Sequence, residues 1–193
     1  LSSAPTLNAS PSGDASLGTG ATVGGPSGSL KLTSGNSISN VAGEVIVQAG
    51  ESSENGAAVK VTAGLSSSFV GGDMLVNAGA GSSGGMAEFK GGQGLKSTGG
   101  SVTISAGLSS MTSSGNLLVN SPDSGSGGAS GSILVNTGVS AVGSSGTITL
   151  STGYASGSNG GAIGVQVGAG KVGTGGELRL ASGSTEDNSN KGG

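Results

Sequence analysis

The sequence predicts an all-β protein, a parallel β-solenoid (β-helix-like) built from about twelve repeats of about 15 residues each. Three observations predict this fold class. An octet with a constant pattern of small, polar and apolar residues recurs along most of the chain. Inside each octet, apolar and polar residues alternate with the period of a strand that buries one face. No stretch shows the apolar periodicity of an amphipathic helix.

Glycine and serine dominate the composition, with 44 glycines and 38 serines among 193 residues. A composition of this kind is usual in disordered linkers. The fixed spacing of the glycines argues against disorder, because a linker has no reason to keep a register. Glycines at both ends of each octet are expected to supply positive φ angles and tight bends between strands.

Each octet follows the pattern glycine, any residue, apolar, any residue, apolar, any residue, small, glycine, as in residues 43–50. Ala57 replaces the opening glycine of one copy, and Pro122 replaces the closing glycine of another. The copies are spaced by 13 to 16 residues. In chain order they are 13–20, 28–35, 43–50, 57–64, 72–79, 85–92, 100–107, 115–122, 131–138, 146–153, 161–168 and 176–183.

The third and fifth positions of the octet hold aliphatic residues, many of them β-branched, which suits a pleated sheet. Stacked repeats would turn these two positions into continuous ladders inside the solenoid. The predicted core ladder consists of Val45, Val47, Val59, Val61, Val76, Val102, Ile104, Val119, Ile133, Val135, Ile148, Leu150, Ile163, Val165, Leu178 and Leu180.

The number of strands in each turn is predicted from the outward residues. The fourth position is mostly uncharged in odd-numbered octets, whereas four of the six even-numbered octets carry a charge there. This difference favours two short strands per turn of about 30 residues over one strand per turn of about 15. Val45 should then stack on Met74 with two strands per turn, and on Val59 with one.

The odd-numbered octets would present a flat face with exposed aliphatic and amide side chains. Such a face is often a contact with another protein surface, although scattered surface leucines are also common. The interface candidates are Ile46, Leu75, Leu134, Gln48, Asn77, Asn136 and Gln166.

Three acidic residues, Asp14, Glu44 and Asp73, share the second position of the first three odd-numbered octets. Stacked at the strand spacing, these like charges would repel unless something neutralised them. Calcium is a weak candidate, and Lys31 and Lys60 of a neighbouring subunit are another. Separate solvated charges are the simplest alternative.

The composition excludes most chemistry. Histidine, cysteine and tryptophan are absent, so we predict no enzyme, no catalytic residue and no bound cofactor apart from the weak calcium candidate. The stretch from Gly168 to Gly173 matches a dinucleotide-binding pattern, but a strand is expected after it instead of the required helix. A net charge of −3 and the scarcity of aromatic residues argue against nucleic acid as a partner.

Three segments are expected along the chain. Residues 1–12 form a degenerate repeat or an N-terminal extension, and residues 13–183 form the repeat domain. Residues 184–193 form a polar C-terminal tail or the start of a further repeat. No apolar run is long enough to span a membrane, and no signal peptide is recognised.

From residue 13 to 183 the repeat resembles glycine-rich parallel β-solenoid repeats of secreted and cell-surface fibres, including algal ones. The resemblance implies an extracellular or cell-surface structural protein, a rigid rod that self-assembles into a fibre, filament, matrix or adhesin. The alternative is a module whose flat β-face binds a glycan, a mineral or ice. Its partners would be further copies of the chain, or a polysaccharide.

Overall fold

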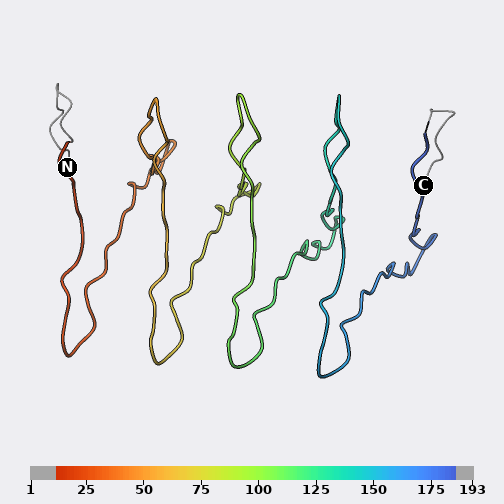
Figure 1. The fold of residues 1–193 in the computed structure, drawn as a ribbon. Coiled ribbons are helices and arrows are strands. Elements are labelled where there is room, and N and C mark those ends of the chain that lie inside the picture. Colours follow the sequence, from red (N-terminus) through yellow and green to blue (C-terminus); the bar gives the residue numbers. More distant parts are fainter. Residues whose placement is uncertain (1–11, 186–193) are drawn as a thin grey trace. The chain divides into compact units, whose positions relative to one another are not determined.

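A computed structural model describes residues 12–185, and this range contains no helix and no strand (Figure 1). The predicted all-β parallel β-solenoid, or parallel β-helix, is therefore wrong for the chain in this structure. The described residues form irregular extended coil with bends. The alternating pattern does produce an extended backbone, but the octets are not joined by the hydrogen-bonded ladders that define a sheet.

The repeat is still visible in the course of the backbone. Every octet runs without a bend, and each of the eleven segments between consecutive octets contains one three-residue bend. In chain order the bends lie at 23–25, 38–40, 53–55, 67–69, 81–83, 95–97, 110–112, 126–128, 141–143, 156–158 and 171–173. We call these intervening segments the loops, and the octets and loops together account for the period of about 15 residues.

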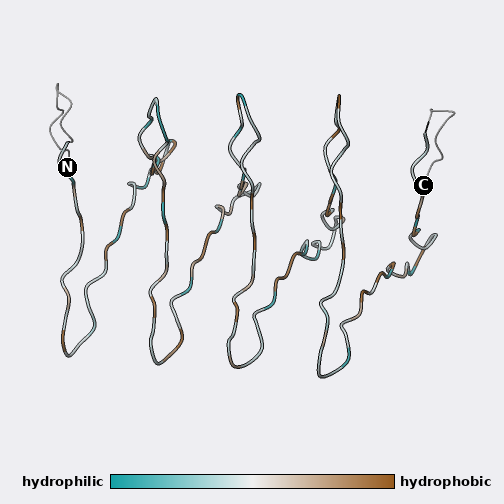
Figure 2. Ribbon diagram, in the orientation of Figure 1, coloured by the Kyte–Doolittle hydropathy of each residue, from teal (hydrophilic) through white to brown (hydrophobic). Residues whose placement is uncertain are grey.

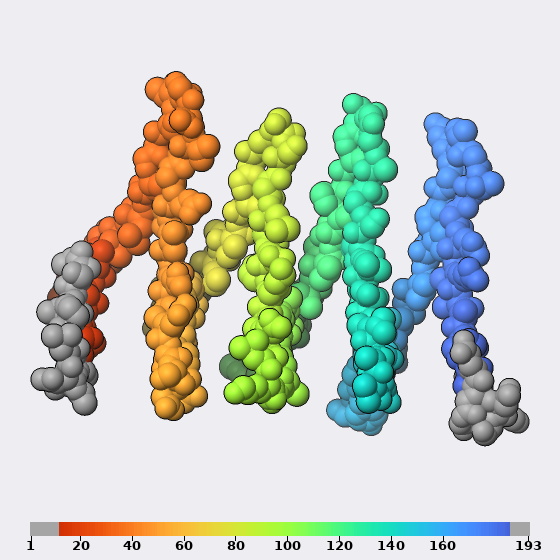
Figure 3. Space-filling view, turned by 90° about the horizontal axis from the view of Figure 1, so that it is seen from above, coloured from red at the N-terminus to blue at the C-terminus, as the bar shows by residue number. Residues whose placement is uncertain are grey.

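No hydrophobic core forms among the described residues, where no apolar or polar side chain is buried. The chain exposes 19091 Å², about 2.4 times the roughly 7,900 Å² expected for a folded monomer of this mass. Apolar residues are scattered along the whole trace (Figure 2). The space-filling view shows slender segments and no solid body of packed side chains within either half of the chain (Figure 3).

The predicted core ladder is accordingly wrong. Its members remain exposed by 50% to 87% of their surface. An octet offers only two aliphatic side chains to bury, and their burial must repay the entropy of fixing a glycine-rich backbone. The residues concerned are Val45, Val47, Val59, Val61, Val76, Val102, Ile104, Val119, Ile133, Val135, Ile148, Leu150, Ile163, Val165, Leu178 and Leu180.

Neither predicted stacking arrangement is formed. Val45, Val59 and Met74 each keep more than half of their surface exposed. A packed ladder would cover each of these side chains from the turn above and the turn below. The choice between one and two strands per turn therefore does not apply to this structure.

The chain divides into two units, Leu1–Gly100 and Ser101–Gly193, of which residues 12–100 and 101–185 are described. The division falls at the opening glycine of the seventh octet, so each unit contains about half of the repeats. The predicted terminal segments 1–12 and 184–193 lie almost wholly outside the described residues.

The glycines do not act mainly through positive φ angles, which corrects the expectation from the sequence. Gly173 is the single described residue with a positive φ, of 88°. Most of the glycine-rich backbone thus adopts angles that other residues can also adopt. The role of the repeated glycines has to be sought in close approach of one backbone segment to another.

Candidate functional site

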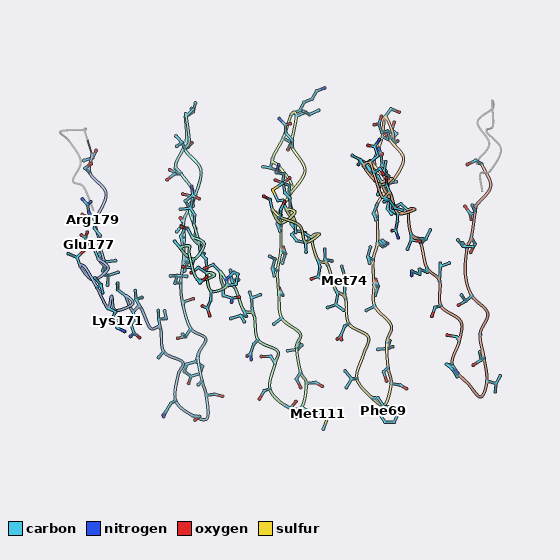
Figure 4. All side chains as sticks on the ribbon, turned by 180° about the vertical axis from the view of Figure 1, so that it is seen from behind. Phe69, Met74, Met111, Lys171, Glu177 and Arg179 are labelled. Atoms are coloured by element: carbon cyan, nitrogen blue, oxygen red, sulfur yellow. The ribbon has the colours of Figure 1, made fainter. Side chains whose placement is uncertain are left out.

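The two ends of a loop are held together by backbone hydrogen bonds between glycines. The amide of an octet's opening glycine donates to the carbonyl of the closing glycine of the preceding octet. Four loops share this bond: Gly72 to Gly64 at 2.9 Å, Gly85 to Gly79 at 2.9 Å, Gly100 to Gly92 at 2.8 Å and Gly115 to Gly107 at 2.9 Å. Phe69 and Met111 lie at the tips of two of these loops (Figure 4).

The small seventh residue of the octet lies against the next opening glycine. A β-carbon built on Gly85 would be 3.6 Å from the Ala78 side chain and 3.3 Å from the Gly79 backbone. In two other loops the seventh residue is a threonine, and its hydroxyl bonds to the next opening glycine. The Thr19 hydroxyl donates to the Gly28 carbonyl at 3.0 Å, and the Thr152 hydroxyl to the Gly161 carbonyl at 3.1 Å. At Gly85 the backbones approach closely, which favours glycine, whereas at Gly28 and Gly161 an added β-carbon would meet a threonine side chain at 3.5–3.6 Å.

Serine side chains stabilise several of the bends by hydrogen bonds, a feature that was not predicted from the sequence. A serine stands two residues after the closing glycine in several loops, and its hydroxyl accepts an amide hydrogen from two or three residues further on. The bonds run from Asn40 to Ser37, from Glu54 to Ser52, from Phe69 to Ser66, from Thr112 to Ser109 and from Gly143 to Ser140, at 2.9–3.0 Å. Aligning the loops by their distance from the closing glycine would have revealed this serine position.

Removing one of these hydroxyls should loosen a single bend. In Ser109→Ala, the amide of Thr112 loses its acceptor, so its hydrogen exchange should accelerate about two- to tenfold, as expected for a bond worth about 0.5–1.5 kcal/mol. Ser110→Ala is the matched control, because the Ser110 hydroxyl makes no hydrogen bond. Equal exchange rates at Thr112 in both variants would contradict the assignment.

The predicted interface residues are all exposed. Ile46, Leu75 and Leu134 expose 73% to 82% of their surface. The amide side chains of Gln48, Asn77, Asn136 and Gln166 are exposed and make no hydrogen bond. Ile46 and Leu75 belong to the first unit and Leu134 to the second. The structure leaves these groups accessible, and their role in an interface stays a prediction.

The acidic candidates Asp14, Glu44 and Asp73 are likewise exposed. Within residues 12–185 no three acidic side chains come close enough to share a metal ion, so calcium at these residues stays a prediction. One ion pair is present in this range, between the Lys90 ammonium and a Glu88 carboxylate oxygen at 2.8 Å. The two residues are two positions apart in the sixth octet.

Aliphatic residues of the octets differ from those of the loops in exposure. At the third octet position, leucine, isoleucine, valine and methionine side chains are 50% to 60% exposed, whereas large apolar residues of the loops are 87% to 108% exposed. The third-position side chains of the octets are thus partly covered, whereas the large apolar side chains of the loops are almost fully exposed. The half-shielded row of aliphatic groups is the feature that every octet shares, apart from the two copies with Ala15 and Ala87 at this position.

Comparison with protein families, with curated proteins and with solved structures finds no match to this chain. Between residues 12 and 185 no candidate membrane-spanning helix occurs. The function is therefore inferred from the geometry of the octets and loops themselves.

Proposed function

We propose that the chain is a structural protein that acts by associating with further copies of itself. The observation that supports this most is the exposure of the aliphatic residues in octet after octet, with no buried side chain in the described range. Exposed apolar surface of this extent is typical of proteins that cover it against a partner. Further copies are suited to this, because each presents the same row of residues at the same spacing.

Repetition strengthens such an association. The contact between two octets is weak, since each contributes two aliphatic side chains and a short length of backbone. Twelve octets in one chain make the later contacts intramolecular once the first has formed. Many weak and equivalent contacts favour an extended assembly, such as a fibre, filament or matrix. The resemblance of the repeat to those of surface fibres supports an extracellular location.

Sedimentation velocity and electron microscopy of the purified chain at increasing concentration test the proposal. We expect the sedimentation coefficient to rise with concentration and fibrous particles to appear in the micrographs. A chain that stays monomeric throughout would overturn the proposed function. If such a monomer were retained on a polysaccharide column, the alternative of a glycan-binding module would replace it. In either case no catalytic role is proposed.

A further inference from the structure

The first five octets alternate in charge. Each contains one charged residue, in the order Asp14, Lys31, Glu44, Lys60 and Asp73. The sixth and twelfth octets each hold one acidic and one basic residue, and the other octets have no charge. The alternation is therefore confined to residues 13–79, within the first unit.

All five charges occupy even-numbered positions of their octets. The acids occupy the second position and the lysines the fourth, both even positions, while the aliphatic residues occupy the third and fifth. In the sixth octet, Glu88 and Lys90 at two even positions form an ion pair. The charges of an octet thus stand at positions other than those of the repeated aliphatic residues.

None of the five charges has a partner in the described chain. All are exposed, and none takes part in an ion pair or a hydrogen bond. A second copy aligned in register would set each charge against its own kind at strand-to-strand distance, which is destabilising. Shifting that copy by one repeat sets acids against lysines at every paired octet.

We propose that two copies of the chain associate through residues 13–79 with an offset of one repeat, so that each lysine octet lies beside an acidic octet. The inference rests on the proposed self-association and adds its register. It holds for parallel and antiparallel copies, because the order of charges reads the same from both ends. The offset leaves one octet uncovered at each end of the pair, where a third copy can bind by the same rule.

Charge reversal tests the alternation. In Lys31→Glu with Lys60→Glu, the first five octets are all acidic, and the protein concentration at half association should rise at least tenfold in low salt. In Asp14→Lys with Glu44→Lys and Asp73→Lys they are all basic, with the same expected loss. An equimolar mixture of the two variants should associate as well as the native chain, and about 1 M NaCl should remove the differences.

The matched control places the same change of charge in the loops, as Lys96→Glu with Lys171→Glu. This control should associate like the native chain. If it weakened association as much as the octet reversal did, net charge and not alternation would be responsible, and the inference would be overturned while the proposed function stood. A native chain that remained monomeric at every concentration would overturn both.

The offset itself can be read from disulfides, because the chain has no cysteine of its own. Thr33 and Gln48 occupy the sixth position of the second and third octets. A mixture of Thr33→Cys and Gln48→Cys chains should form mainly the mixed disulfide dimer upon mild oxidation. Each variant alone should form little dimer. Predominant self-dimers of either variant, Thr33→Cys or Gln48→Cys, would show in-register pairing and refute the offset.

Discussion

Replacing four octet valines by threonine is expected to raise the concentration for half association by roughly thirtyfold or more. The four are Val45, Val59, Val76 and Val102, each 54% to 57% exposed in the single chain. Threonine keeps the β-branched shape but replaces one methyl group of valine by a hydroxyl. Covering the remaining apolar surface is worth about 0.5–1 kcal/mol for each valine, and that contribution is lost. Sedimentation velocity over a concentration series measures the shift.

The control makes the same change at four of the six loop valines, which are almost fully exposed. These are Val23, Val139, Val142 and Val172. If octets provide the contacts and loops do not, this quadruple variant should associate within about twofold of the native chain. Equal weakening by the two sets would show that the apolar contacts have no preference for octets, against the proposed function.

Gly91→Ala is expected to open the loop between the sixth and seventh octets. A β-carbon on Gly91 would collide with the carbonyl oxygen of Gly100, so one of the two backbone segments must move away. The bond from the Gly100 amide to the Gly92 carbonyl, 2.8 Å long, should then break. Hydrogen exchange at the Gly100 amide should accelerate about tenfold, corresponding to a bond of roughly 1.4 kcal/mol.

Gly92→Ala provides the comparison, since a β-carbon there would meet open space. It should leave exchange at Gly100 nearly unchanged, although it alters the adjacent residue. Equal acceleration in both variants would mean that glycine flexibility, and not the close approach at Gly91, maintains the loop. Gly91 is also the one glycine at an octet position that otherwise holds alanine, serine, threonine or valine, and the collision explains this departure.

The short strands predicted from the alternating octets are absent from residues 12–185. Alternating residues such as Val45 and Val47 specify an extended backbone, and the structure has extended octets with bends between them. The same alternation says nothing about which segment covers the aliphatic side. Expecting the next repeat of the same chain to do so led to the β-solenoid, whereas Val45 remains more than half exposed.

For the glycines, the sequence showed where they recur but not why glycine is required there. Their positions at the octet ends were evident, but the expected reason, positive φ, holds at Gly173 alone among the described residues. At four opening glycines, Gly72, Gly85, Gly100 and Gly115, a neighbouring backbone lies close; at Gly72 an added β-carbon would be 3.2 Å from the Gly64 nitrogen. For closing glycines such as Gly79 and Gly107 a side chain would meet open space, and the structure gives no steric reason for them.

Of the candidate site, Ile46 and Leu75 are exposed, but so are residues predicted to face inward, such as Val47, so the outward positions of the interface candidates stay a prediction. The hydroxyl-closed bends were not predicted, since serine is so frequent that the position of Ser66 or Ser109 did not stand out. Their partners are local, two or three residues away, and the pattern becomes visible once the loops are aligned on the preceding glycine.

The glycine-to-glycine bond that closes a loop has a consequence for how the chain can vary. The same bond, 2.9 Å long, closes the five-residue loop 80–84 and the seven-residue loop 65–71. What lies between the two glycines is therefore free to change in length and composition without displacing the octets. Tips such as Phe69 and Met111 are positions at which a foreign peptide could be displayed at regular intervals, while the octets keep their own spacing.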